Sequence, residues 1–371
     1  MTGWRYNALD GLARMLPPPV RAAAALAVYT PGHLGDVLHA VPMLQALRHG
    51  KPETKIIWLV GPWSAALARR YAALVDEIRT FGPDLPNYTR GKREWRQSAW
   101  RQWRLALDLR RIGIDVLIGP MDGIGRFLAN TLCPRLWAGI GEWRPPRVRA
   151  SVQTVFQPYE KDRYEADAWC GLLEPLGIAA RAERLAYEPT PAERQAADEF
   201  LKAEGVAMER PLVLIAPGSG WSGKNWLPER FGEVAAWLAS ERGAQIAWIG
   251  GPDEAGLVPD IRAGDFRWFG KVPLATLAAT MPRARLFVGN DGGLLHFAAA
   301  QDVPTVSVWG PTSSGKWGPK GSRHRQVRRA ERCDGCIYWD YRETCRRDRA
   351  CMKAVAIGAV REAVAAVWAG G

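Results

Sequence analysis

Three charged residues of this chain stand just after strand-like apolar runs, at glycine-rich turns. Asp36 lies in "YTPGHLGDVLHAVP", Lys224 in "APGSGWSGKNW" and Asp291 in "VGNDGGLLHFAAA". A carboxylate at such a turn can accept a proton or hold hydroxyl groups, and an ammonium can balance the charge of a phosphate. Together these residue types point to chemistry on a phosphorylated ligand.

The first turn places Gly32 and Gly35 between a strand and a helix, with Asp36 at the helix start. Glycines there let backbone N–H groups approach a ligand closely, and a helix N-terminus favours negative charge. Asp36 is equally well placed as a plain helix N-cap, and these residues alone do not separate the two roles. The dinucleotide fingerprint G-x-G-x-x-G is absent from the sequence.

The second half of the sequence has three such loops. In the first, the hydroxyls of Ser219 and Ser222 and a single lysine suit phosphate, although the Walker spacing fails. The second offers the amides of Gly292 and Gly293 at a helix start, and the third offers Thr312 in "GPTSSGKWGP". Each loop alone is as well explained by an ordinary turn of a parallel sheet, but together they favour a nucleotide diphosphate.

The elements that would position these loops alternate along the chain. Short apolar runs predict strands at "ALAVYT", "KIIWLVG", "IDVLIGP", "PLVLIAPG", "AQIAWIGG", "ARLFVGND" and "VPTVSVWG". Amphipathic patterns predict helices over 37–48, 191–205 and 228–243, so the fold class is α/β with parallel sheets covered on both faces. The likeness of "LGDVLHAVP" to "NDGGLLHFAAA" indicates two similar doubly wound halves, joined between 180 and 211, with a ligand between their strand ends.

Composition limits the class of protein. With 371 residues, 47% hydrophobic and 24% charged, the chain is an ordinary globular protein of two domains. The net charge of +12 indicates an anionic partner, and the many Trp residues beside Arg also suit a membrane interface. We find neither an apolar run long enough to span a bilayer nor a signal peptide, which predicts a cytoplasmic protein.

The motifs "GDVLHAVP", "PGSGWSGKNWLPERF", "GNDGGLLHFAAAQDVPTVSVWGPT" and "CDGCIYWDYRETCRRDRACM" resemble those of glycosyltransferase family 9, the ADP-heptose:lipopolysaccharide heptosyltransferases and their relatives. The resemblance implies a GT-B fold, two Rossmann-like domains facing across a cleft, and an inverting, metal-independent sugar transfer. It divides the chain into an N-terminal extension (1–23), an acceptor-side domain (24–190), a nucleotide-sugar domain (191–350) and a helix (352–371) that packs back on the first domain.

The resemblance also assigns roles. Asp36 matches the family's proposed general base, and Lys224 matches the residue that pairs with the donor diphosphate. Asp291 matches the carboxylate that holds donor-sugar hydroxyls, while His296 and the neighbouring glycine amides would line the pyrophosphate. Gly292 stands where the family usually has Ser or Thr, so one hydroxyl contact to phosphate is in doubt.

Two further sets of residues complete the expected donor loops. Ser219, Ser222 and Thr312 are expected near the phosphates. Val272 and Leu274 lie where the family packs the base, mainly through backbone. His296, one turn into an apolar helix, could instead satisfy a buried backbone group, and His39 is expected to be structural.

Four cysteines, Cys333, Cys336, Cys345 and Cys351, have the spacing C-x2-C-x8-C-x5-C. In a cytoplasmic chain this leaves two readings open, a structural zinc or iron site and four reduced thiols, because the second pair does not fit a zinc ribbon. No cofactor is expected for catalysis. Cys133 and Cys170 are expected to be core thiols.

The acceptor is the least specified partner. The basic stretch 87–111 has a helical stripe of Trp95, Ala99, Trp103 and Ala106, which either packs on the core or faces an anionic acceptor or lipid headgroup. The leading function is transfer of heptose from an ADP-sugar to a lipopolysaccharide-core-like hydroxyl, with peripheral contact at the inner membrane. Two enzymatic alternatives are a family 9 transferase that uses another nucleotide sugar and one that modifies a protein acceptor. The non-enzyme alternative is a basic nucleic-acid-binding protein, although no nucleic-acid module is recognisable.

Overall fold

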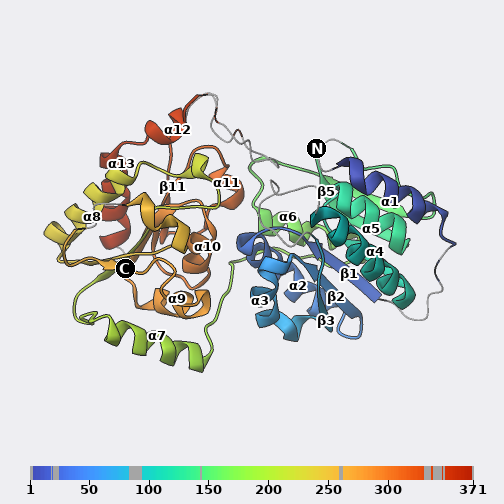
Figure 1. Ribbon diagram of the computed structural model, residues 1–371, viewed down its shortest axis with the longest axis horizontal. Helices are drawn as coiled ribbons and strands as arrows, with labels where there is room; N and C mark the ends of the chain where they lie inside the picture. The colour runs from blue at the N-terminus through green and yellow to red at the C-terminus, as the bar shows by residue number, and fades with distance from the viewer. Residues whose placement is uncertain are drawn as a thin grey trace. The chain divides into compact units, whose positions relative to one another are not determined.

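The structure is a computed structural model that describes residues 3–17, 19, 25–82, 94–142, 144–258, 262–329, 336, 345 and 347–369, with the backbone alone for 3–8 and 94–99. The chain divides into two compact units (Figure 1). Unit 1 comprises Met1–Glu160 and Glu165–Glu183, and unit 2 comprises Lys161–Tyr164 and Arg184–Gly371. The change from unit 1 to unit 2 at Glu183 lies inside the connector expected between 180 and 211.

Unit 1 is built on a parallel sheet with the strand order β3-β2-β1-β4-β5-β6. Its strands are β1 (Ala25–Thr30), β2 (Lys55–Val60), β3 (Glu77–Thr80), β4 (Ile114–Ile118), β5 (Leu136–Gly141) and β6 (Gln153–Pro158). Its helices are α1 (Gly3–Met15), α2 (Leu34–Gly50), α3 (Ala65–Ala68), α4 (Glu94–Ile112), α5 (Gly123–Leu132) and α6 (Glu165–Gly171), with 3-10 turns η1 (Pro62–Ser64), η2 (Arg69–Leu74) and η3 (Glu174–Leu176). The strand order reverses between β1 and β4, and such a switch point leaves a crevice outside the carboxyl ends of the strands.

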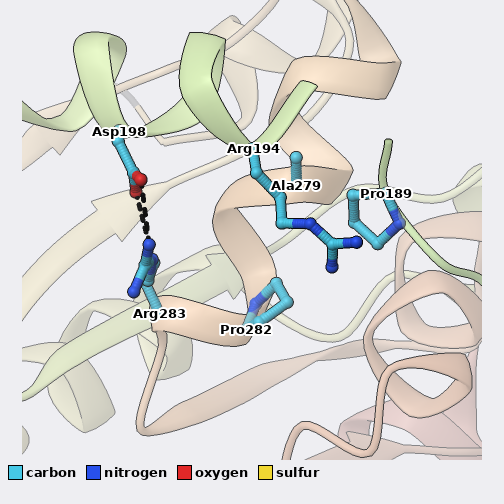
Figure 2. A pocket seen from close by; sticks show the side chains of 6 residues that line it. All are labelled: Pro189, Arg194, Asp198, Ala279, Pro282 and Arg283. Atoms are coloured by element: carbon cyan, nitrogen blue, oxygen red, sulfur yellow. Dashed lines mark hydrogen bonds and ion pairs between the residues drawn. The ribbon is translucent and has the colours of Figure 1, made fainter. Parts of the chain in front are cut away.

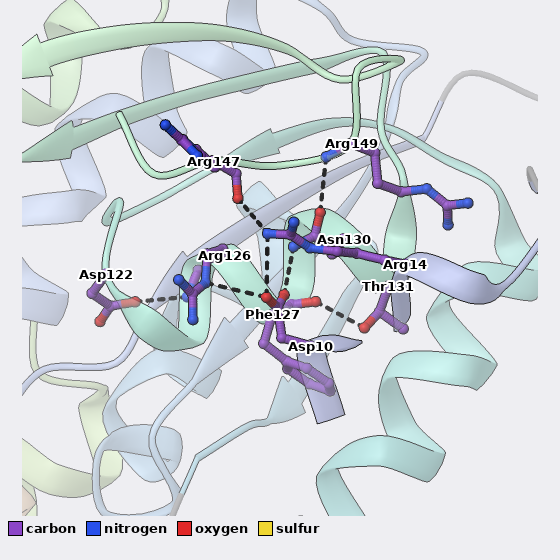
Figure 3. A network of polar contacts seen from close by, with 10 residues as sticks. Asp10, Arg14, Asp122, Arg126, Phe127, Asn130, Thr131, Arg147 and Arg149 are labelled. Atoms are coloured by element: carbon purple, nitrogen blue, oxygen red, sulfur yellow. Dashed lines mark hydrogen bonds and ion pairs between the residues drawn. The ribbon is translucent and has the colours of Figure 1, made fainter. Parts of the chain in front are cut away.

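The N-terminal extension is part of unit 1, because α1 packs along α5. Asp10 is buried there and accepts a hydrogen bond from Asn130 Nδ2 at 2.5 Å, while Arg126 Nε lies 3.4 Å from its other oxygen (Figure 3). Arg14 donates to the carbonyl of Arg147 at 2.7 Å. A buried carboxylate with these partners fixes the position of α1 against α5.

Unit 2 repeats the same topology, with the strand order β12-β11-β10-β7-β8-β9. Its strands are β7 (Leu212–Ala216), β8 (Gln245–Trp248), β9 (Phe266–Arg267), β10 (Leu286–Asn290), β11 (Thr305–Val308) and β12 (His324–Val327). Its helices are α7 (Pro191–Ala203), α8 (Pro228–Arg242), α9 (Leu274–Thr280), α10 (Gly293–Ala300), α11 (Ser314–Trp317), α12 (Ala350–Lys353) and α13 (Ile357–Ala369), with 3-10 turns η4 (Ser222–Lys224), η5 (Pro252–Leu257) and η6 (Met281–Arg283). β10 pairs with β7 as β4 pairs with β1, so the prediction of two similar doubly wound halves is confirmed.

The central strands are buried from end to end, as their apolar sequences predict. Every residue of β1, β7 and β10 is buried. Each unit has its own core, in which alternate side chains of the strands, from one face of the sheet, pack under the helices. Two rigid parallel sheets therefore hold the loops that follow their strands.

The last helix was expected to pack back on the first domain; that contact stays a prediction, and the packing seen for this helix is within unit 2. α13 packs on β11, β12 and α8. Val360, Val364 and Val367 are buried in the core of unit 2, together with Val306 and Val308 of β11. The apolar stripe at i, i+4 and i+7 is thus used within unit 2.

The basic stretch of the first half contains α4. Trp103 and Ala106 pack on the core of unit 1, with Trp103 against Phe127 at 5.9 Å between ring centroids, whereas Arg104 is exposed. The side chains of Trp95 and Ala99 lie outside the described residues. The two described members of the stripe therefore have the core-packing role. Among the helices described here, we find none whose length and apolar character would let it cross a membrane.

Candidate functional site

The switch point of unit 2 brings two of the predicted residues into contact. Lys224 follows β7 and Asp291 follows β10, the two neighbouring strands at which the strand order reverses. Lys224 Nζ lies 3.1 Å from Asp291 Oδ2, and the two side chains are 9% and 7% exposed. An ammonium and a carboxylate are thus held together at the edge of the sheet where such folds bind ligands.

Thr312, in the loop after β11, completes this cluster. Its Oγ1 donates to Asp291 Oδ2 at 2.7 Å, and Thr312 is buried. Burial raises the pKa of Asp291. The charges of Lys224 and His296 and the Thr312 hydroxyl outweigh this effect, so the pKa lies below its ordinary value and the carboxylate is ionised.

His296 lies on the same side of α10 as the carboxylate. Its Nε2 is 3.9 Å from Asp291 Oδ1, and its side chain is buried. The role of His296 in the donor site stays a prediction. His39 is fully buried in α2, in keeping with the structural role expected for it.

The glycine turn before α10 faces the first phosphate-loop candidate. Gly292 has extended backbone and is the N-cap of α10, whose first helical residue is Gly293. A Cβ atom on Gly292 would lie 3.7 Å from Ser219 Cβ, an ordinary van der Waals contact. The loops after β7 and β10 therefore approach each other, and a hydroxyl-bearing side chain at 292 would fit.

The two serines of the first loop have different settings. Ser219 Oγ is 2.8 Å from the Trp221 carbonyl and 2.6 Å from Asn225 Oδ1, so its hydroxyl stabilises the loop. Ser222 is exposed at the start of η4. Of the two, Ser222 is the hydroxyl turned to solvent.

A half-buried carboxylate that the sequence analysis missed borders the same loop. Glu254 lies after β8, and its carboxyl packs so closely on Gly218 and Gly250 that a Cβ there would meet its oxygens at 2.1 and 2.4 Å. Burial raises its pKa, against the effect of a hydrogen bond from Gly251 N. The signal was present in "IGGPDEA", where an acidic residue follows a predicted strand and a glycine pair.

The predicted base-packing residues follow β9. Val272 is half-buried, and Leu274, the first residue of α9, is 37% exposed. Because β9 is parallel to β8, these residues lie at the same edge of the sheet as the phosphate loops. An exposed Leu beside a half-buried Val is a surface on which a planar ring can pack.

In unit 1, Asp36 lies after β1, at the corresponding switch point. The expectation that Asp36 is the helix N-cap is wrong, because α2 starts earlier: the N-cap is His33 and Asp36 is the third helical residue. Asp36 Oδ2 accepts a hydrogen bond from His33 N at 2.6 Å. A Cβ on Gly32 would lie 2.2 Å from the Asp36 carboxyl carbon, so the glycine is required for the loop to wrap around this carboxylate. Gly35 is buried in the same turn.

Trp63, after β2, holds this loop from the neighbouring strand. Its Nε1 donates to the Gly32 carbonyl at 2.9 Å, and its ring centroid is 6.2 Å from that of His33. The ring also lies on Gly61, where a Cβ would meet it at 2.7 Å. Nothing in the sequence pattern singles out this tryptophan among the 18 of the chain.

The described cysteines of the C-x2-C-x8-C-x5-C segment differ in how buried they are. Cys351 is buried in the unit 2 core against Gly310, Cys345 is half-buried, and Cys336 is exposed. Within the residues that the structure describes, no three His, Cys, Asp or Glu side chains form a group suited to a metal ion. Cys333 lies outside the described residues. Cys133 and Cys170 are buried, as expected of core thiols, and burial raises the pKa of Cys170 to about 11.

A separate hollow lies between α7 and α9, at the end of the unit 2 sheet opposite these loops. Pro189, Arg194, Asp198, Ala279, Pro282 and Arg283 line it (Figure 2). Arg283 forms a bidentate pair with Asp198 at 2.7 and 2.9 Å, and Arg194 lies 3.4 Å from Glu188. None of the predicted site residues lines this hollow, so it is not the candidate site.

Comparisons with known proteins give a family and several relatives. Residues 167–345 match glycosyltransferase family 9 (heptosyltransferase). The chain is 25% identical over 320 residues to lipopolysaccharide heptosyltransferase 1 of Pseudomonas aeruginosa, covering 82% of this chain and 83% of that protein.

Solved structures share the fold. A family 9 glycosyl transferase from Veillonella parvula covers 95% of this chain and 100% of its own, with a TM-score of 0.75 and 21% identity. Escherichia coli heptosyltransferase WaaC with ADP-2-deoxy-2-fluoro heptose covers 92% and 99%, with a TM-score of 0.59 and 19% identity. The iron-containing dodecameric glycosyltransferase TibC of enterotoxigenic E. coli covers 95% and 78%, with a TM-score of 0.57 and 16% identity. The two doubly wound units thus have the GT-B type of fold found in heptosyltransferases.

Proposed function

The chain belongs to glycosyltransferase family 9, and we propose that it transfers a heptose from ADP-heptose to a hydroxyl group of an anionic, lipopolysaccharide-core-like acceptor, with inversion at the anomeric carbon. The observation that carries the proposal is the buried cluster of Lys224, Asp291 and Thr312 at the switch point of unit 2. Support for the donor comes from WaaC, a structural relative that was solved with an ADP-heptose analogue.

In this proposal unit 2 binds the donor. Lys224 has three N–H donors, so it can keep its bond to Asp291 and still donate to a phosphate oxygen of the diphosphate. The amides at Gly292 and Gly293 lie at the N-terminus of α10, which favours the same negative charge. Glu254 is suited to the ribose hydroxyls, because acidic residues after strands of such sheets commonly bind a ribose.

Asp291 would accept hydroxyl groups of the donor sugar. Its Oδ2 is engaged by Lys224 and Thr312, and its Oδ1 faces His296 at 3.9 Å, a longer separation than a hydrogen bond. The Oδ1 lone pairs are therefore the ones suited to a sugar hydroxyl. The ionised state of the carboxylate, which its lowered pKa favours, strengthens such bonds.

Asp36 of unit 1 would be the general base. The acceptor oxygen forms a bond to the anomeric carbon as the bond from that carbon to the β-phosphate oxygen breaks. The acceptor proton passes to Asp36, and the electron pair leaves with ADP, whose charge Lys224 balances. One displacement inverts the anomeric configuration. The site's own cation serves the leaving group, so the proposed transfer uses no divalent metal, and no step involves the cysteine segment.

The test is turnover of ADP-heptose with a defined acceptor in the presence of EDTA, followed by NMR assignment of the new anomeric centre. We expect activity in EDTA and an inverted product. Asp36→Asn keeps an oxygen that can accept from His33 N, so it separates chemistry from folding, and it should lower kcat by about 10²- to 10⁴-fold. Its ADP affinity by calorimetry should stay within about threefold of the wild type.

A panel of other nucleotide sugars and a protein acceptor belongs in the same assay. Turnover of another donor in preference to ADP-heptose would replace the substrate assignment and leave the site assignment intact. Nucleic-acid binding without turnover of any nucleotide sugar would overturn both. Localisation at the cytoplasmic face of the inner membrane stays a prediction, to be measured by fractionation of cells.

A further inference from the structure

A four-residue segment of the chain belongs to unit 2 although its neighbours in sequence belong to unit 1. The chain up to Glu160 and again from Glu165 is part of unit 1, while Lys161–Tyr164 makes its contacts in unit 2. The sequence analysis assigned no role to this segment. Two of its residues contact the loop after β11, which carries Thr312.

Asp162 is the first contact. Ser313 Oγ donates to Asp162 Oδ1 at 2.5 Å. As the N-cap of α11, Ser313 Oγ also accepts a hydrogen bond from Lys316 N at 3.2 Å. Ser313 is buried, and a Cβ on Gly315 would lie 3.3 Å from Asp162 Cβ. A hydroxyl with one strong acceptor and one donor has a defined orientation, and the carboxylate packs directly on the turn.

Tyr164 is the second contact. Lys320 Nζ lies 4.0 Å from the centroid of the Tyr164 ring, within the range of a cation–π interaction, and Tyr164 is buried. Asp162 thus contacts the start of the loop 312–320, and Tyr164 contacts its end. The loop that supplies Thr312 is held at both ends by this segment.

We propose that Asp162 is a positioning residue of the donor site, acting through Ser313 on Thr312. Thr312 and Ser313 are consecutive, and their hydroxyls bind two carboxylates, Asp291 and Asp162, at 2.7 and 2.5 Å. A small displacement of the turn would break the bond to Asp291, because hydrogen bonds weaken steeply with distance and angle. The inference rests on the proposed function, since Asp291 is assigned there to the donor.

The experiment uses calorimetric binding of ADP and steady-state kinetics on the full chain. Asp162→Ala should weaken ADP binding and raise KM for the donor by about tenfold, as expected for the loss of one charge-assisted hydrogen bond, with kcat within about threefold. Asp162→Asn keeps an acceptor oxygen and should restore binding to within about threefold. Glu209→Ala, at an exposed carboxylate of the same unit, is the control.

Ser313→Ala provides the second arm, and thermal unfolding of every variant shows whether it folds. If Asp162 acts through Ser313, the double variant should bind ADP no more weakly than the Ser313→Ala variant. Additive losses, or an Asp162→Ala variant that binds ADP like the wild type, would overturn the inference while the donor site stands. A wild-type chain that binds no ADP would instead overturn the proposed function, and this inference with it.

Discussion

Lys224 Nζ and Asp291 Oδ2 lie 3.1 Å apart although 67 residues separate them in sequence, and both side chains are buried. The contact joins the loops after β7 and β10, the pair of strands at which the sheet order of unit 2 reverses. A buried ion pair is a poor source of net stability, because desolvation of two charges offsets their attraction. The position of this pair, at the edge of the sheet where such folds bind ligands, accords with the proposed role of both residues in donor binding.

Removal of Lys224 should therefore have two effects. Lys224→Ala leaves the Asp291 carboxylate buried without its cation, which should lower the free energy of unfolding by about 3 kcal/mol and weaken ADP binding by at least about tenfold. Urea unfolding and calorimetry measure the two effects. The control is Lys271→Ala, which breaks a more exposed pair with Glu204 and should leave ADP binding unchanged. Unchanged ADP affinity in the Lys224 variant would place the diphosphate elsewhere.

The lowered pKa of Asp291 predicts the pH dependence of stability. The pKa of an unfolded aspartate is about 3.9, and the folded value lies below it, so the folded state binds fewer protons. The stability due to this carboxylate is fully present above about pH 4 and is lost as the pH falls through the folded pKa. Urea unfolding across pH should show the wild type well above Asp291→Asn near neutral pH and the gap closing in acid. A gap that is constant down to about pH 3 would contradict the assignment.

Trp63 should affect the position of the Asp36 carboxylate, because both side chains bond to the loop that contains Gly32 and His33. Trp63→Phe keeps an aromatic ring on Gly61 but removes the indole N–H that donates to the Gly32 carbonyl at 2.9 Å. We expect kcat to fall by about tenfold, with ADP affinity unchanged because ADP is assigned to unit 2. Trp248→Phe removes an indole donor to Asp265 in unit 2 and serves as the matched control. Equal losses of kcat in both variants would show a general effect of losing an indole rather than one on the Asp36 loop.

The sequence predicted most of the continuously buried strands, but not Leu136–Gly141, whose run "LWAGIG" contains two glycines. All seven apolar runs named from the sequence are strands, because each is a central or near-central strand with both faces covered. The pattern missed strands with partly exposed, mixed compositions, such as Glu77–Thr80 and Gln153–Pro158, which lie at the two edges of their sheet. Edge strands carry less apolar signal because one side of them faces solvent or loops.

The candidate site residues likewise divide into those that local sequence patterns predict and those that they do not. Asp36, Lys224 and Asp291 were found from local motifs, since a glycine turn after a strand is readable within a few residues. Asp162 and Trp63 make contacts that span 151 and 31 residues, and no local pattern encodes such pairs. Glu254 follows a predicted strand and a glycine pair, so its sequence position was noticeable. It becomes a site candidate only because the structure packs its carboxyl group against Gly218.

Gly292 offers a test of the one departure from the family motif. Its backbone is extended, with φ of −169°, and a Cβ there meets nothing closer than 3.7 Å. Gly292→Ser should therefore fold with equal or slightly higher stability, because Ser is a better N-cap than Gly by roughly a few tenths of a kcal/mol. The added hydroxyl stands at the start of α10, where the diphosphate is expected, so ADP binding should be retained or strengthened. Gly289→Ala is the contrast, since its Cβ would lie 2.9 Å from the Ala216 carbonyl oxygen, and it should unfold at a lower temperature. Loss of ADP binding in a stable Gly292→Ser protein would mean that the phosphates need the space that this glycine leaves open.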